Sequence, residues 1–202
     1  MRLRNPETAG NPPVDPHSDC QLVEVTPKTH DVLIDLAYAT PRNFTGKPVY
    51  RRAVCYLHAD AEKLLGRAVE LAAAQGYRIK IFDGFRPSEA QWVLWNHTPD
   101  PDFLADPRRG SLHSRGVAID LTLVAENGDD LDMGTAFDAF TPLSYHGDTA
   151  IPVAVQRNRS ILLGLMSAAG WDFYMKEWWH YQLFDGRRYP VLSDETLAEG
   201  IM

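Results

Sequence analysis

The sequence has 202 residues, of which 45% are hydrophobic and 23% are charged, and its formal net charge is −7. This length allows one sizeable core and is short for two, so we expect a single domain over residues 21–202. The acidic balance argues against nucleic acid or an anionic membrane surface as partners, and no stretch approaches the ~20 apolar residues that cross a bilayer.

The first 20 residues are polar and rich in proline, which predicts a flexible arm over residues 1–20. They include basic residues but no apolar core of a secretory signal, so we expect a cytoplasmic protein. The two cysteines, Cys20 and Cys55, are too few for a disulfide framework. A single bridge between them is an alternative, but reduced thiols agree better with the cytoplasm.

The next part of the chain predicts a strand, a connection and a helix. Residues 31–39 (DVLIDLAYA) predict a strand that leads to Tyr38, and residues 41–56 predict an irregular or hairpin connection. Apolar residues at helical spacing predict a helix over residues 59–75, which Gly76 ends.

A strand and a helix are expected to meet at Arg86. RIKIF (residues 78–82) predicts a strand, and Pro87 suits the first turn of a helix, so Arg86 is placed at the junction. The simpler interpretation of Arg86 is a salt bridge at the strand end, with Asp83 as its partner. Residues 97–110 are rich in proline and aspartate, which predicts a loop.

The segment VAIDLTL predicts a buried strand that carries a carboxylate, Asp120, near its middle. Burial of a charge is costly unless the charge is paired or bound to a cation, so this position requires an explanation. By alternation, Asp120 shares a face with Ala118 and Thr122, and the larger apolar residues take the other face. His113 lies seven residues before Asp120, and Gly116 lets the chain bend between them.

The C-terminal part predicts a helix over residues 158–169, which Gly170 ends, and then a strand or hairpin in WDFYMKEWWHYQLF. Glu177 and His180 lie three residues apart in that aromatic segment. A helix would place both on one face, but the aromatic composition favours a strand with a kink at its start.

Together, His113, Asp120 and His180 have the ligand types of a hydrolytic zinc site, in which three residues bind the metal and a fourth position is left for water. Glu177 would stay unligated as the general base. The chain contains no HExxH motif, which excludes a zincin helix. The remaining histidines have no suitably spaced partner and are expected to be surface or structural residues: His17, His30, His58, His97 and His146.

Strands and helices do not alternate strictly along the chain, and the last strands are close enough to form hairpins. We therefore expect an α+β fold, a small mainly antiparallel sheet with helices packed on one face. The zinc site is expected on the open face of that sheet.

Two motifs, SLHSRGVAIDLTL and EWWHY, resemble those of the D-alanyl-D-alanine dipeptidases of the VanX type. The resemblance covers roughly residues 22–190, and it implies a hedgehog/DD-peptidase-like fold. The segment between Arg86 and His113 has 26 residues and is shorter than in the resistance-type enzymes, so the chain is closest to the short-loop chromosomal members. Further segments match in the same order: LAYATPRNFTGKPVY, IFDGFRPSEAQ, MGTAFDAF and QRNRSILLGLMSAAGW.

The resemblance also implies roles for single residues. It implies one zinc ion per chain, bound by His113, Asp120 and His180, with Glu177 as general base and then general acid. It implies that Arg86 faces the developing oxyanion, and a permanently charged guanidinium suits that role.

For the substrate, the resemblance implies a pocket that recognises both charged ends of a free dipeptide. Asp138 would pair with the ammonium group, Tyr38 would help to close that end, and Ser111 would lie near the carboxylate. The simpler interpretation of Asp138 and Ser111 is that they are ordinary loop caps.

With the ligand set, Glu177 and Arg86, the resemblance implies zinc-dependent hydrolysis of D-Ala-D-Ala to two D-alanines, with the small dipeptide as the partner. One alternative keeps the fold and the zinc but acts on peptidoglycan stem peptides, as a D,D-carboxypeptidase or endopeptidase. Another is a zinc-stabilised binding module without activity, against which the presence of Glu177 and Arg86 argues. The oligomeric state is left open.

Overall fold

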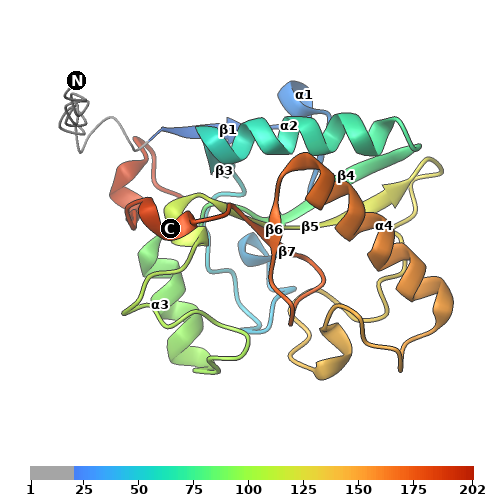
Figure 1. Cartoon of the computed structure of the whole chain (residues 1–202). Coiled ribbons are helices and arrows are strands. Elements are labelled where there is room, and N and C mark those ends of the chain that lie inside the picture. Colours follow the sequence, from blue (N-terminus) through green and yellow to red (C-terminus); the bar gives the residue numbers. More distant parts are fainter. Residues whose placement is uncertain (1–20) are drawn as a thin grey trace, which may run out of the picture.

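The computed structural model describes residues 21–202, which form a mixed α+β structure (Figure 1). The expected arm over residues 1–20 lies outside the described residues, and so does Cys20; pairing of Cys20 with the buried Cys55 therefore stays untested. Within the described chain, no helix is long and apolar enough to cross a membrane.

The main sheet has five strands in the order β2-β4-β5-β7-β6. β2 and β4 are parallel and the other neighbours are antiparallel, so the expectation of a mainly antiparallel sheet is confirmed. A separate antiparallel pair joins β1 (Leu22–Val25) to β3 (Cys55–His58). The strands of the main sheet are β2 (Leu33–Ile34), β4 (Tyr77–Asp83), β5 (Ala118–Ala125), β6 (Asp172–Phe173) and β7 (His180–Gln182).

Two long helices, α2 (Ala59–Ala73) and α4 (Val153–Ala169), pack against each other and cover one side of this sheet (Figure 1). α3 (Ser88–His97) lies on the other side and packs in a second apolar cluster with Tyr38 and Tyr50. The single-turn α1 spans Pro27–His30. Short 3-10 turns span Ala37–Ala39, His113–Arg115, Pro142–Ser144, Gly186–Arg188 and Asp194–Thr196.

β5 has the predicted alternation. Ile119 and Leu121 are fully buried in the core formed with α2 and α4, whereas Asp120 contacts polar side chains. Asp120 lies opposite Asp83 of β4 and opposite His180 of β7. A register shift between Ile81 and Asp83 produces the first of these pairings, because a bulge re-aims the end of a strand. The sheet therefore brings three ionisable side chains into one row.

Several element boundaries differ from the predictions. The strand expected over residues 31–39 reduces to the two residues of β2, which pair with β4, and a 3-10 turn follows at Ala37–Ala39. The last helix begins at Val153, five residues before the expected start, and α2 ends two residues early. The segment WDFYMKEWWHYQLF forms the expected hairpin, in which β6 pairs antiparallel with β7 and a turn before His180 connects the two strands.

Candidate metal and catalytic site

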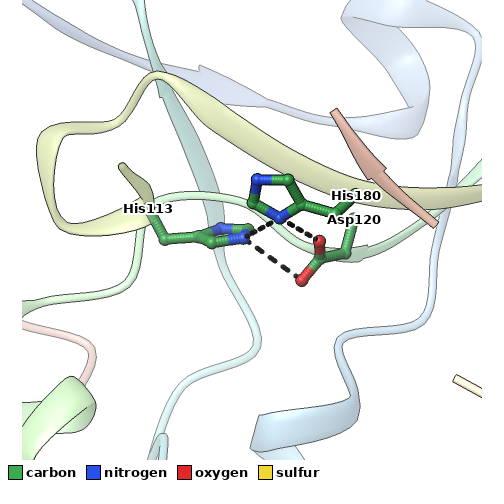
Figure 2. A group of neighbouring side chains, drawn as sticks. All are labelled: His113, Asp120 and His180. Atoms are coloured by element: carbon green, nitrogen blue, oxygen red, sulfur yellow. Dashed lines mark hydrogen bonds and ion pairs between the residues drawn. The ribbon is translucent and has the colours of Figure 1, made fainter. Parts of the chain in front are cut away.

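His113, Asp120 and His180 converge on one point, as predicted (Figure 2). The distance from His113 Nε2 to His180 Nδ1 is 3.1 Å, and Asp120 lies 3.3 Å from the first nitrogen and 3.1 Å from the second. The side chains are 4%, 3% and 12% exposed, respectively. Among residues 21–202, these three form the one group of histidine, cysteine or carboxylate ligands close enough to share a metal ion.

Each histidine uses its other nitrogen in a hydrogen bond that fixes the ring. His113 Nδ1 is 2.8 Å from the carbonyl of Gly84, which can only accept, so this nitrogen carries the proton. His180 Nε2 is 3.1 Å from Oε1 of Gln182, and Asp172 accepts from the amide nitrogen of the same glutamine. Both histidines therefore direct an unprotonated nitrogen toward Asp120, which is the arrangement of metal-ligating histidines.

The geometry of the three atoms fits a metal ion. Ligand distances of about 2.0–2.2 Å in a tetrahedron give donor–donor distances of about 3.3 Å, close to those found here. Two nitrogen lone pairs and a carboxylate repel one another unless a cation lies between them. Although burial disfavours the charged form, protons on the two imidazole rings would lower the pKa of Asp120 well below its ordinary value, and a cation between the three groups would keep the carboxylate ionised in the same way.

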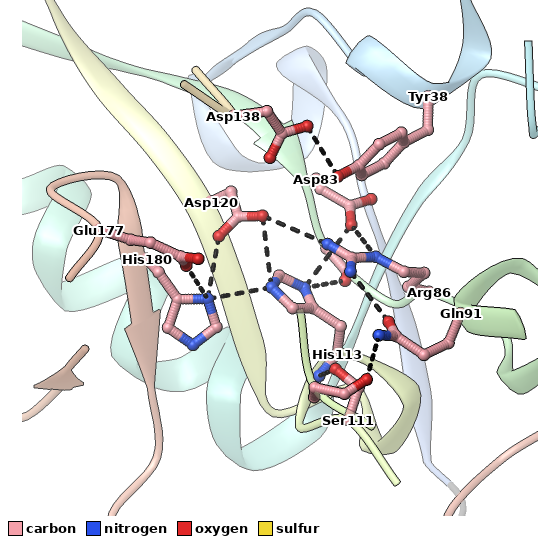
Figure 3. A network of polar contacts seen from close by, with 12 residues as sticks. Tyr38, Asp83, Arg86, Gln91, Ser111, His113, Asp120, Asp138, Glu177 and His180 are labelled. Carbon is pink, nitrogen blue, oxygen red and sulfur yellow. Dashed lines mark hydrogen bonds and ion pairs between the residues drawn. The ribbon is translucent and has the colours of Figure 1, made fainter. Parts of the chain in front are cut away.

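Glu177 lies beside this cluster in the turn that precedes β7 (Figure 3). Its Oε2 is 3.8 Å from His180 Nδ1, so the predicted kink before the strand brings the two side chains together. Glu177 is 7% exposed, and burial, with the nearby Asp120 and Asp138, raises its pKa well above the ordinary value. A carboxylate with a raised pKa can take a proton and return it at neutral pH.

Arg86 lies on the opposite side of the cluster from Glu177 (Figure 3). Its Nε donates to Asp83 at 2.8 Å, so the salt bridge considered above is present, and its Nη2 is 3.5 Å from Asp120. The guanidinium carbon also lies 4.9 Å from the ring centre of Tyr38. Asp83 is fully buried and receives a second hydrogen bond of 2.8 Å from the hydroxyl of Tyr50. The salt bridge holds the guanidinium at the cavity and does not remove it from the site.

A cavity of about 500 Å³ opens over the cluster. Tyr38 donates a hydrogen bond of 2.8 Å to Asp138 in its wall, and burial, with Asp120 nearby, raises the pKa of Asp138 to about 8. Ser111 Oγ accepts from the backbone nitrogen of His113 at 3.2 Å, so this hydroxyl does cap a turn while it lines the cavity. All eight residues singled out from the sequence line this cavity: Tyr38, Arg86, Ser111, His113, Asp120, Asp138, Glu177 and His180.

Sequence reasoning missed several residues that hold the site in place. Tyr50 lies in a segment without regular structure, and nothing in its local pattern indicated contact with Asp83. Gln182 was detectable, because it lies two residues after His180 and shares its strand face. Gln91 accepts a hydrogen bond of 2.9 Å from Arg86 but gave no signal within its helix. The described histidines outside the cluster are His30, His58, His97 and His146, and His17 lies outside the described residues.

Comparisons with known proteins agree with these findings. The model of a peptidase family described as D-ala-D-ala dipeptidase matches residues 18–197. The chain is 41% identical over 175 residues to the D-alanyl-D-alanine dipeptidase of Escherichia coli strain K12. The aligned region covers 87% of this chain and 91% of that protein. It is 38% identical to the D-alanyl-D-alanine dipeptidase of Enterococcus faecium, over 77% of this chain and 88% of that protein. Identity to the enzyme of the same name from Streptomyces coelicolor is 35%, over 74% and 84% of the two chains.

Proposed function

The chain belongs to the D-ala-D-ala dipeptidase family of metallopeptidases, and from that membership we propose that it hydrolyses D-Ala-D-Ala to two D-alanines with one bound zinc ion. One observation carries the proposal: two histidine lone pairs and a carboxylate converge in a cavity that also holds a buried glutamate and an arginine. This combination has the parts of a metal-assisted hydrolase.

His113, Asp120 and His180 would hold the metal. Nitrogen and carboxylate oxygen suit zinc, and three protein ligands leave a position for water and substrate. When bound, zinc polarises the scissile carbonyl and increases the acidity of water. Gly84 and Gln182 fix the two histidine rings, so the ligands are oriented before the metal arrives.

Glu177 is proposed to move the proton. It would take a proton from the attacking water and deliver it to the amine of the departing D-alanine. Its burial suits both steps, because a raised pKa makes the carboxylate a stronger base and then a usable acid. Arg86 would stabilise the negative charge that develops on the carbonyl oxygen, with Asp83 fixing the direction of its guanidinium.

The two ends of the dipeptide would meet different walls of the cavity. Asp138 would bind the ammonium group of the dipeptide. The Tyr38 hydroxyl would hold the Asp138 side chain in place through its hydrogen bond to that carboxyl group. Ser111, which lines the same cavity, would lie near the substrate carboxylate. Cytoplasmic residence stays a prediction.

The decisive experiment compares the zinc-loaded wild type with Glu177→Gln and with Glu126→Gln, an exposed glutamate far from the cavity as matched control. We expect all three proteins to bind one zinc ion per chain by metal analysis. Turnover of D-Ala-D-Ala should fall by about 10²–10⁴-fold in Glu177→Gln alone, because general acid–base catalysis contributes that much. A Glu177→Gln enzyme as fast as the wild type would refute the assigned role.

Substrate class is tested by a panel of D-Ala-D-Ala, L-Ala-L-Ala, a D,D-tripeptide and a stem pentapeptide. The proposal predicts that the free D,D-dipeptide is the best substrate. Faster cleavage of the stem peptide would support the D,D-carboxypeptidase or endopeptidase alternative. A zinc-loaded protein that cleaves nothing in the panel would support the binding-module alternative.

A further inference from the structure

Residues 98–110, called the strap from here on, contribute residues 101–106, Arg109 and Gly110 to the lining of the cavity that holds the metal cluster. The strap has no helix or strand over its length, yet Leu104 in its middle is 5% exposed and packs in the second apolar cluster. A segment without regular structure requires side-chain contacts to keep one position. The strap has such contacts with three parts of the site.

The first contact joins the strap to the turn that carries Glu177. Lys176 pairs with Asp102 through its ammonium group at 2.5 Å, and the Tyr174 hydroxyl donates to the carbonyl of Asp102 at 3.1 Å. The second contact joins it to the loop that carries Asp138, because Phe103 stacks on Phe140 with ring centres 5.0 Å apart.

The third contact passes through Gln91 of α3, which is 1% exposed. Its Oε1 accepts from Arg86 Nη1 at 2.9 Å, and its Nε2 donates to the carbonyl of Ala105 at 2.7 Å (Figure 3). Arginine can only donate and a backbone carbonyl can only accept, so a bridge between them needs one acceptor and one donor. A neutral amide has both, and neither a carboxylate nor an apolar side chain of this length does.

We propose that Gln91 is a positioning and specificity-determining residue: its amide fixes Arg86 and the strap together, and the fixed strap restricts the cavity to a dipeptide. This inference rests on the proposed dipeptidase function. A longer substrate would have to displace the strap, and displacement breaks the Gln91–Ala105 bond and leaves a buried carbonyl unpaired. Shorter substrates bind without that penalty.

The test uses two substitutions of Gln91 that separate its hydrogen bond with Arg86 from its hydrogen bond with Ala105. Gln91→Glu keeps an acceptor for Arg86 but places a second acceptor against the Ala105 carbonyl, so it should release the strap alone. Gln91→Met has similar length and should release both partners. Gln75→Glu, at an exposed position beyond the end of α2, is the matched control.

Three readouts are measured on the zinc-loaded proteins: amide hydrogen exchange of residues 98–110, kcat and KM for D-Ala-D-Ala, and the tripeptide-to-dipeptide ratio of kcat/KM. In Gln91→Glu we expect about tenfold faster exchange in the strap and a higher KM, with kcat kept within a few-fold. In Gln91→Met kcat should fall as well, since Arg86 is no longer oriented. The tripeptide-to-dipeptide ratio should rise about tenfold in both variants.

Unchanged exchange of the strap in Gln91→Glu, or an unchanged substrate ratio in both variants, would overturn the inference. If the wild type cleaves no dipeptide, the proposed function fails, while the exchange data still decide whether Gln91 holds the strap. Should the Gln91 variants not fold, Lys176→Met removes a second, partly exposed tie to the strap, at Asp102. Faster exchange confined to the strap is then expected, and its absence counts against the inference.

Discussion

A pair of tyrosine hydroxyls provides a direct test of how the buried charges are stabilised. Tyr50 and Tyr181 are 2% and 0% exposed. The Tyr50 hydroxyl donates to the buried carboxylate of Asp83 at 2.8 Å, whereas the Tyr181 hydroxyl has no hydrogen-bond partner among the described residues. Each tyrosine changed to phenylalanine removes one oxygen atom from the interior, so the two substitutions differ mainly in that hydrogen bond.

Tyr50→Phe should lower the free energy of unfolding by about 1.5–3 kcal/mol, the range for a hydrogen bond to a charged group. The substitution removes a hydrogen bond from Asp83. Burial already raises the pKa of this carboxyl group, and Arg86 and His113 only oppose that effect. Tyr181→Phe should leave stability unchanged or raise it by about 1 kcal/mol, because a buried hydroxyl without a partner is unfavourable.

Urea unfolding at pH 7, with all proteins in the same metal state, measures both values. Equal unfolding midpoints for Tyr50→Phe and the wild type would refute the argument that this bond stabilises Asp83. A Tyr181→Phe variant as unstable as Tyr50→Phe would show that loss of the hydroxyl itself, and not of the bond to a charge, determines the effect.

Three further predictions concern the metal, pH and backbone. Chelation should abolish activity and lower the unfolding temperature, and excess zinc at about 1,000 times its Kd should restore about 4 kcal/mol of stability; equal unfolding curves with and without zinc would argue against these ligands. In metal-free protein, the raised pKa of Asp138, about 8, means that its ionisation destabilises the fold as pH rises from about 4. As the pH rises from about 4 to about 8, the free energy of unfolding of Asp138→Asn should therefore increase relative to that of the wild type. A difference between the two proteins that does not change with pH would contradict this prediction. Gly116→Ala should destabilise, because Gly116 has a φ of +68° and an added Cβ would lie 2.7 Å from Leu22 Cδ2; Gly128→Ala, at φ +89° with open space around it, separates the clash from the backbone strain in the same unfolding assay.

The sequence predicted the parts of the fold that depend on periodicity and on single costly residues. α2 and the two faces of β5 followed from the spacing of apolar residues, and Asp120 stood out because a charge inside an apolar strand needs a partner. Glu177 and His180 were correctly placed together, since a kink before the strand was required for both to reach one point.

The rest depends on contacts that local sequence does not encode. β2 is only two residues long, and its position is set by pairing with β4, so the longer strand expected there was wrong. Tyr50 contacts Asp83 across 33 residues of sequence. Gln91 contacts Arg86 across 5 residues, from a helix to the end of the preceding strand. A hydrophobic pattern gives no information about such hydrogen bonds, because the donors and acceptors lie on different elements.

The row formed by Asp83, Asp120 and His180 across β4, β5 and β7 links metal loading to correct strand pairing. Successive side chains of a strand point to opposite faces, so a slip of one residue in β5 would turn Asp120 into the apolar core and present Ile119 or Leu121 to the histidines. A misregistered sheet would lack the third ligand and would therefore bind the ion less tightly. A metal ion bound by these three residues would therefore favour the native register over its nearest competitor, and metal content would report whether the sheet has paired correctly.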